Sequence, residues 1–315
     1  MNMLKTSAAS LTVLFLAACG ACNCNVPGYT AGVAAVPAGA ATAAPGTVVL
    51  PPGVTPPAAT PPPATLSCNQ AAGAFALGPA LAPFALLAGT TITNTGNTIV
   101  TYAAGAVTGS FNDDLVGVSP GTAVVGFYPP GVVADGPNAI YAIGYNNTPA
   151  VPLAAENALT TAYNTLAGMA APPGNVFPGG QDLSLANEPG YPTGTLPPGV
   201  YKSASTMGIL AGNLTLTGNG NPQSVFVFQA GSALTTTLNA GAGGNIILTN
   251  GASACNVYWQ VGTSAVLGGA SFYGNVLAAA SVTLTTSTQF TGRALASSGA
   301  VTISTATLIT DPGGK

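Results

Sequence analysis

The chain has 315 residues, of which 48% are hydrophobic and only 3% are charged, whereas about 25% are charged in a typical soluble domain. Four Lys and Arg residues cannot form a basic patch, which excludes nucleic-acid binding. The chain contains no His, which excludes His-based acid–base chemistry, Ser/His and Cys/His nucleophile pairs and most zinc sites. We therefore predict no cofactor and no metal ion.

Residues 1–19 predict a lipoprotein-type signal peptide. Lys5 precedes the apolar stretch AASLTVLFLAA at 8–18, which is too short to span a membrane comfortably. The following LAAC ends at Cys19 and resembles a bacterial lipobox, so that cleavage would leave a lipidated Cys19 and a membrane as a partner. An ordinary secretory signal cut near Ala18 is the alternative. Both predict export, either as a cell-surface or outer-membrane lipoprotein or as a secreted protein.

The other cysteines fit an oxidising compartment. Cys22 and Cys24 lie close to Cys19, but the lack of His and of a second cysteine pair nearby disfavours a metal site over a disulfide or free thiols. Cys68 and Cys255 are candidates for a disulfide, although the sequence alone does not establish their pairing.

Residues 20–66 predict a tether without a fixed fold, and residues 67–315 a folded domain. The tether is rich in Pro, Ala and Thr and carries no charge. Dense proline prevents helix and sheet pairing and favours extended polyproline II segments. Such a segment holds a domain away from a surface.

One segment of the folded domain has the period of an amphipathic helix. Residues 152–168 begin with Pro152 and end with Gly168, as helices often do. Five residues share one face at helical spacing, which must pack on the rest of the domain. These are Ala155, Leu159, Ala162, Tyr163 and Leu166.

The rest of the domain consists of short Val/Thr/Leu/Phe runs separated by Gly and Asn, a pattern typical of strands and turns. Four segments repeat an apolar run, a corner of small residues and an alternating strand, with a spacing of 18 or 19 residues at the C-terminal end. This period predicts a three-sided β-solenoid. The segments are 224–236, 256–269, 275–286 and 293–305.

Alternation within these strands predicts which side chains point into the solenoid and which point out. The predicted inward residues are Leu234, Val266, Leu284 and Ile303. The predicted outward residues are Thr235, Thr283, Thr285, Thr302 and Ser304. Thr is common on any half-exposed strand, but solvated faces normally also carry Lys and Glu. Their absence predicts a flat, uncharged surface.

Six segments follow one another in order from about residue 74 to 310 and are specific as a set, at 84–101, 115–131, 155–168, 196–236, 254–268 and 274–303. Together they resemble the ice-binding proteins of bacteria and fungi. The resemblance implies a mainly β fold, a right-handed, three-faced, discontinuous β-solenoid with one long helix packed alongside. It also implies adsorption to an ice crystal through one flat face, which inhibits ice growth or recrystallisation.

The candidate ice-binding residues are the five outward residues above together with Thr95 and Thr98. The last two belong to TGNT at 95–98, the one stretch that fits well the T-A/G-x-T/N pattern of strongly active relatives. Leu267 and Gly268 interrupt the predicted threonine rows. We expect an insertion rich in Gly, Pro and Tyr at 128–149 either to cap the solenoid or to cover part of a face.

Two other classes of function are alternatives to ice binding. A structural, adhesive or self-associating surface protein fits the same uncharged solenoid, since exposed solenoid ends can stack. A polysaccharide-cleaving enzyme needs clustered carboxylates or a metal. Only Asp113 and Asp114 are neighbours, and in the context NDD they favour a turn. We therefore predict no enzyme activity.

Overall fold

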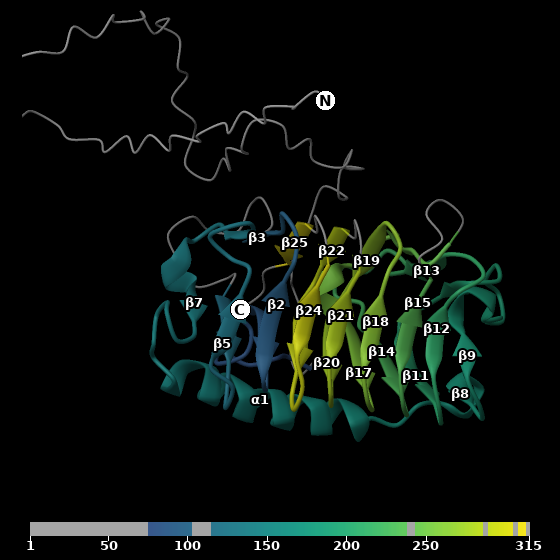
Figure 1. Cartoon of the computed structure of the whole chain (residues 1–315). Coiled ribbons are helices and arrows are strands. Elements are labelled where there is room, and N and C mark those ends of the chain that lie inside the picture. Colours follow the sequence, from purple (N-terminus) through teal and green to yellow (C-terminus); the bar gives the residue numbers. More distant parts are fainter. Residues whose placement is uncertain (1–74, 103–114, 238–242, 286–288, 305–307, 313–315) are drawn as a thin grey trace, which may run out of the picture. The chain divides into compact units, whose positions relative to one another are not determined.

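A computed structural model describes residues 75–102, 115–237, 243–285, 289–304 and 308–312. They form a three-sided solenoid of parallel strands with one long helix beside it (Figure 1). Strands on each side pair with the strands one coil before and after them. The predicted mainly β, solenoid fold is confirmed.

Sheet A is the nine-stranded side that lies against the helix. Most of its strands are buried along their whole length, because one side faces the interior and the other is covered. Its strands, in order across the sheet, are β7 (Ile140–Tyr141), β4 (Leu115–Val118), β1 (Phe84–Ala88), β23 (Ala294–Ala296), β20 (Asn275–Ala278), β17 (Val257–Val261), β14 (Phe226–Ala230), β11 (Gly199–Ser203) and β8 (Val176–Phe177).

Sheet B is the eight-stranded side, and its outer face is uncovered in Figure 1. Six of its strands alternate between buried and accessible residues, whereas β12 is buried along its whole length and both residues of β9 are half-buried. In order across the sheet they are β5 (Ala123–Val125), β2 (Thr91–Asn94), β24 (Val301–Ile303), β21 (Val282–Leu284), β18 (Ala265–Leu267), β15 (Leu234–Thr236), β12 (Met207–Ile209) and β9 (Gln181–Asp182).

The third side is divided into two sheets. The five-stranded sheet has the order β19 (Ser271–Tyr273), β22 (Gln289–Thr291), β25 (Leu308–Asp311), β3 (Ile99–Tyr102) and β6 (Val132–Val133). The three-stranded sheet has the order β10 (Thr195–Leu196), β13 (Leu214–Thr217) and β16 (Ile246–Thr249). Four short 3₁₀ helices lie in the connections, η1 (Pro137–Ala139), η2 (Pro173–Asn175), η3 (Leu183–Leu185) and η4 (Ala254–Asn256).

The solenoid is discontinuous in sequence, as predicted. The N-terminal strands β1, β2 and β3 pair with β23, β24 and β25 of the last coil. Residues about 200 positions apart therefore become neighbours, for example Thr93 and Thr302. The body is complete only when both ends of the chain have folded together.

The long helix α1 (Ala150–Ala167) runs along sheet A between the N-terminal coil and β8. It begins two residues before the predicted start, and Ala155, Leu159 and Leu166 are buried as predicted. At its C-terminal end, Gln229 Nε2 donates hydrogen bonds to the Leu166 and Met169 carbonyl oxygens, at 2.6 and 2.8 Å. No helix in the described segments is long and apolar enough to cross a membrane.

The interior contains a continuous stack of aromatic rings along the solenoid. The ring centroids of Phe228 and Trp259 are 4.1 Å apart, and those of Phe272 and Phe290 are 5.6 Å apart, both pairs stacked. Tyr201 extends the stack at one end. Close-packed rings of this kind add stability beyond the area they bury and make the coil spacing rigid.

The prediction that Val266 points into the core is wrong. Val266 is 40% exposed, whereas Ala265 and Leu267 on either side of it are fully buried. Leu234 is level with Ala265 and not with Val266, because a small apolar residue fills the inward position of this coil. The other three predicted inward residues, Leu234, Leu284 and Ile303, are fully buried.

The insertion at 128–149 forms part of the terminal coil of the solenoid. Its strand β6 pairs with β3, and its strand β7 pairs with β4. The Tyr145 hydroxyl donates a hydrogen bond to the Phe127 carbonyl oxygen at 2.7 Å. The insertion therefore extends one end of the solenoid and does not cover sheet B.

Several predictions concern residues outside the described segments. These are the signal peptide with Cys19, the tether, Cys22, Cys24, Cys68, Asp113 and Asp114. The structure leaves them as predictions.

Candidate functional site

The outer face of sheet B carries a straight middle row of small side chains. Strand pairing places the central outward residue of each coil beside that of the next coil, about 4.8 Å away. Four of the seven residues in this row are Thr. From β5 to β12 the row contains Val125, Thr93, Thr302, Thr283, Val266, Thr235 and Gly208.

Two flanking rows lie two residues before and two residues after the middle row, since alternate residues of a strand share a face. None of their residues is charged. The preceding row contains Ala123, Thr91, Ala300, Ser281, Ser264, Ala233 and Thr206. The following row contains Thr95, Ser304, Thr285, Gly268 and Thr237. We refer to the three rows together as the flat face.

Six of the seven candidate residues lie on the flat face. Thr235, Thr283 and Thr302 belong to its middle row, and Thr95, Thr285 and Ser304 to the following row.

The prediction that Thr98 belongs to the ice-binding face is wrong, because Thr98 is fully buried. Its hydroxyl donates a hydrogen bond to Asn94 Oδ1 at 2.7 Å. The Asn94 amide in turn donates to the carbonyl oxygens of Gly96 and Gly126 at 2.7 and 2.8 Å. TGNT therefore forms the corner after β2, and Thr95 and Asn97 are the exposed residues of this motif.

The contribution of β2 to the flat face was not predicted from the sequence. Thr91 and Thr93 occupy the first and middle rows, beside Ala300 and Thr302. The strict alternation in TITNT at 91–95 was a usable signal for an outward threonine strand. The strand that pairs with β2 lies about 200 residues away, so the spacing of the C-terminal coils alone does not reveal its place.

Some hydroxyl groups of the flat face are fixed by the backbone of a neighbouring coil. Thr285 Oγ1 donates a hydrogen bond to the Leu267 carbonyl oxygen at 3.0 Å. Thr95 Oγ1 donates to the Ile303 carbonyl oxygen at 3.3 Å. These bonds restrict side-chain rotation before any ligand arrives, so less rotamer entropy remains to be lost on binding.

Three apolar side chains interrupt the threonines. Val125 is 55% exposed at one end of the middle row, and Val266 lies within it. At the other end, Leu210 is 47% exposed. A Cβ atom on Gly208 would lie 2.8 Å from Leu210 Cγ, so the Leu210 side chain covers the Gly208 position. The flat face is therefore apolar at both ends.

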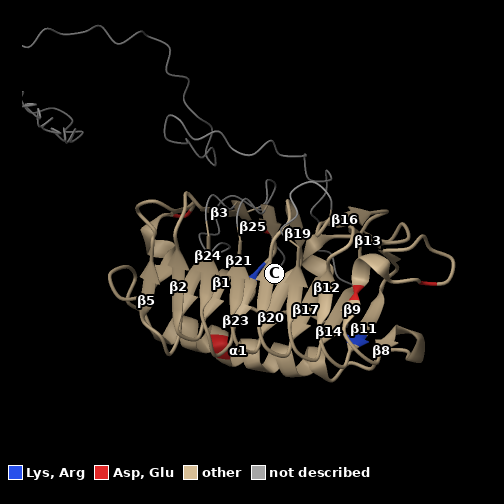
Figure 2. Cartoon of the chain, turned by 45° about the vertical axis from the view of Figure 1, so that its right-hand side comes forward, with Lys and Arg blue, Asp and Glu red and all other residues tan. Residues whose placement is uncertain are grey.

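The flat face is uncharged from β5 to β12, and the first charge beyond it, the Asp182 carboxylate, is stabilised by hydrogen bonds. Asp182 on β9 pairs beside Gly208. Its carboxylate accepts hydrogen bonds from the backbone NH groups of Ser184, Leu210 and Ala211, at 2.9 to 3.1 Å. Figure 2 shows how few charged residues the described part carries, one of them on β9, the strand next to β12.

A strongly perturbed carboxyl group, that of Glu156, lies on α1, away from the flat face. Glu156 is buried, and its Oε1 atom has no hydrogen-bond partner among the described residues. Burial raises the pKa of Glu156 to about 8. Hydrolysis of a glycosidic bond normally uses a pair of carboxyl groups, and a single carboxyl group does not supply that pair. The described residues also contain no group of three or more potential metal ligands.

Comparison with known proteins assigns the family. The model of the ice-binding-like family matches residues 86–309. The chain belongs to this family. An ice-binding protein of Nostoc sp. (strain HG1) is 41% identical over 224 residues, which are 70% of this chain and 69% of that protein.

Solved structures agree with this assignment. An ice-binding protein from an Antarctic biological consortium has a TM-score of 0.56 and 33% identity, covering 81% of this chain and 95% of that one. The corresponding domain of Shewanella frigidimarina ice-binding protein 1 has a TM-score of 0.57 and 30% identity, covering 76% and 98%. The family and fold are those of ice-binding proteins and not of enzymes.

Proposed function

We propose that this family member adsorbs to ice through the flat face of sheet B and thereby inhibits ice growth or recrystallisation. Membership of the ice-binding-like family supports ice as the ligand. The observation that favours this face is its three uncharged rows, two of which cross all seven paired strands. Of the candidate residues, Thr235, Thr283, Thr285, Thr302, Ser304 and Thr95 belong to this proposal, and Thr91 and Thr93 are added to it.

The composition of the flat face suits a ligand made of water. Ice offers no charge that could pair with a buried ion, so charged groups on the face would lose hydration without compensation. Methyl and hydroxyl groups in regular rows can order a layer of water that matches the crystal. The fixed spacing of the strands and the stacked core keep the entropy cost of adsorption low.

The other sides of the solenoid fit this role less well. Sheet A is covered by α1. One outward row of the five-stranded sheet mixes side chains of very different length, since Ser271, Gln289, Leu308, Ile99 and Val132 lie next to one another. In its second outward row the bulky Tyr273 lies beside a run of three threonines, Thr291, Thr310 and Thr101. Such a row is uneven, and an uneven row contacts a flat crystal at few points.

Partitioning into ice tests this proposal. The purified full chain should concentrate in ice that grows slowly from a dilute solution, while a non-binding protein of similar size stays in the liquid. Equal amounts of both proteins in the ice fraction would refute the proposal.

We also propose that the protein is exported and attached to a membrane through a lipidated Cys19. The support is the apolar segment followed by LAAC in the sequence. In a bacterial host fed a labelled fatty acid, the chain should take up the label and the Cys19→Ser variant should not. Efficient release of the unlabelled chain into the medium would instead indicate an ordinary secretory signal.

A further inference from the structure

The solenoid has one corner that lies opposite the flat face. Each coil runs from sheet A to sheet B, then to the third side and back to sheet A. In a three-sided body, the corner between the third side and sheet A therefore lies across the interior from sheet B. Gly274–Asn275 and Gly292–Arg293 turn this corner in two successive coils. We refer to it as the opposite corner.

The first described residues of the chain lie at this corner. The Phe75 ring packs edge-on against the Tyr258 ring with a centroid distance of 4.8 Å. The Tyr258 hydroxyl donates a hydrogen bond to the Phe75 carbonyl oxygen at 3.4 Å. Tyr258 is level with Asn275, at the start of the sheet A strands. Leu77 and Leu81 are also buried, which keeps the entering segment against the body.

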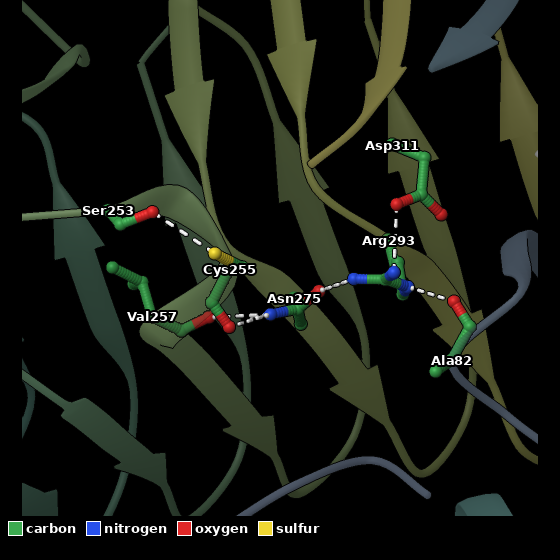
Figure 3. Close-up of polar contacts among 7 residues, drawn as sticks. All are labelled: Ala82, Ser253, Cys255, Val257, Asn275, Arg293 and Asp311. Atoms are coloured by element: carbon green, nitrogen blue, oxygen red, sulfur yellow. Dashed lines mark hydrogen bonds and ion pairs between the residues drawn. The ribbon is translucent and has the colours of Figure 1, made fainter. Parts of the chain in front are cut away.

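A buried polar network fixes the same entry point (Figure 3). Arg293 is 2% exposed, and its Nε atom donates a hydrogen bond to the Ala82 carbonyl oxygen at 2.7 Å. Its guanidinium also donates to Asn275 Oδ1 at 2.9 Å and to Asp311 Oδ1 at 2.8 Å. One side chain thus joins the entering segment, an inner coil and the last strand.

A disulfide lies beside this network. Cys255 is disulfide-bonded, and the Asn275 amide donates hydrogen bonds to the Cys255 and Val257 carbonyl oxygens at 3.1 and 3.2 Å. The predicted partner, Cys68, would place the covalent link close to Phe75 in sequence. Cross-links and buried charge pairs are costly to break, so the attachment at this corner is strong.

We propose that this protein links ice to a carrier, such as a cell surface, that is attached to its N-terminal segment. The reason is that this segment enters the fold at the corner opposite the flat face. This inference rests on the proposed function. A cell surface or other carrier attached at the opposite corner lies behind the solenoid, and all seven strands of the flat face remain open. The protein would then act as an ice adhesin for its carrier as well as a binder of ice.

Site-specific attachment of a protein-sized cargo tests the inference. Ala76 lies beside Phe75 at the entry point, and Thr235 lies on the flat face; both are small and exposed. Full-length variants with Cys19, Cys22 and Cys24 changed to Ser would carry either Ala76→Cys or Thr235→Cys. Each variant is biotinylated on the new thiol and saturated with streptavidin, and the parent without a new cysteine reports background labelling. Ice partitioning is measured before and after streptavidin is added.

The Ala76 conjugate should partition into ice within twofold of its unconjugated form, and streptavidin-coated beads carrying it should adhere to ice. The Thr235 conjugate should partition into ice at least tenfold less than its unconjugated form. Equal loss in both conjugates, or retention in both, would overturn the inference while leaving ice binding itself intact. If the unconjugated variants keep their melting temperatures but do not partition into ice, the proposed function fails and this inference fails with it.

Discussion

Replacement of Thr283 by Tyr is the sharpest perturbation of the flat face. Thr283 lies in the middle row on the central strand of the seven, between Thr302 and Val266. A Tyr ring at this position would stand above its neighbours and hold the surrounding surface away from ice. Thr283→Val removes only the hydroxyl and keeps the shape, so it is the matched control.

The expected magnitudes follow from the size of the face. Seven strands span about 29 Å, and the three rows span about 13 Å along the strands, which gives about 380 Å². At ~25 cal/mol per Å² the whole contact contributes at most about 9 kcal/mol. If the Tyr ring keeps its own strand and both neighbouring strands out of contact with ice, the adsorption free energy falls by about 4 kcal/mol. This corresponds to roughly a thousandfold decrease in the adsorption constant. Loss of one hydroxyl should cost about 1 kcal/mol.

Thermal hysteresis and adsorption isotherms on ice measure these effects, and circular dichroism measures the melting temperature. Both variants should melt within a few degrees of the wild type, because a half-exposed substitution shifts stability by about 0.5 kcal/mol. The reasoning is refuted if Thr283→Tyr keeps its activity, or if Thr283→Val loses as much as Thr283→Tyr.

Three further predictions concern the edge of the flat face, the helix and the opposite corner. Val125→Ser should weaken ice adsorption two- to fivefold, whereas Leu153→Ser, which changes a similarly exposed side chain (52%) on α1, should not; equal effects would contradict a contact at Val125. Because burial raises the pKa of Glu156 from 4.5 to about 8, the fold holds this proton more tightly than the unfolded chain, and the free energy of unfolding should fall between pH 4.5 and 8. Glu156→Gln should remove most of this slope and stabilise the protein at pH 8 by roughly 4 kcal/mol; an unchanged slope in denaturant titrations would show that Glu156 is not its source. Arg293→Met removes the cation beside the buried carboxylate of Asp311 and should cost about 3–5 kcal/mol in urea unfolding; a loss below 1 kcal/mol would mean that the pair does not hold the corner.

Much of the fold could be predicted because it depends on local periodicity. The helix was found from one apolar face, in which Ala155, Leu159 and Leu166 are buried. The coils were found from alternation in strands such as VTL at 282–284 and VTI at 301–303, which have the expected buried and accessible pattern.

The errors arose where alternation was ambiguous or the contacts were distant. Ala265 and Val266 are both apolar, so the sequence did not show which of them points inward. The turn that buries Thr98 depends on the Asn94 side chain reaching Gly126, in the next coil. The place of Thr93 on the flat face depends on pairing across about 200 residues, and no local pattern reports such a pairing.

The claim that sheet B meets the ice is tested most directly by comparing one Tyr substitution on each outward side. Thr302 lies on sheet B, Thr291 on the third side and Thr161 on the outer face of α1, and all three are accessible. Ice partitioning of the three folded variants at equal concentration should fall at least tenfold for Thr302→Tyr and remain within twofold of wild type for Thr291→Tyr and Thr161→Tyr. Full partitioning of Thr302→Tyr together with loss in either of the other variants would place the ice contact on a different side of the solenoid.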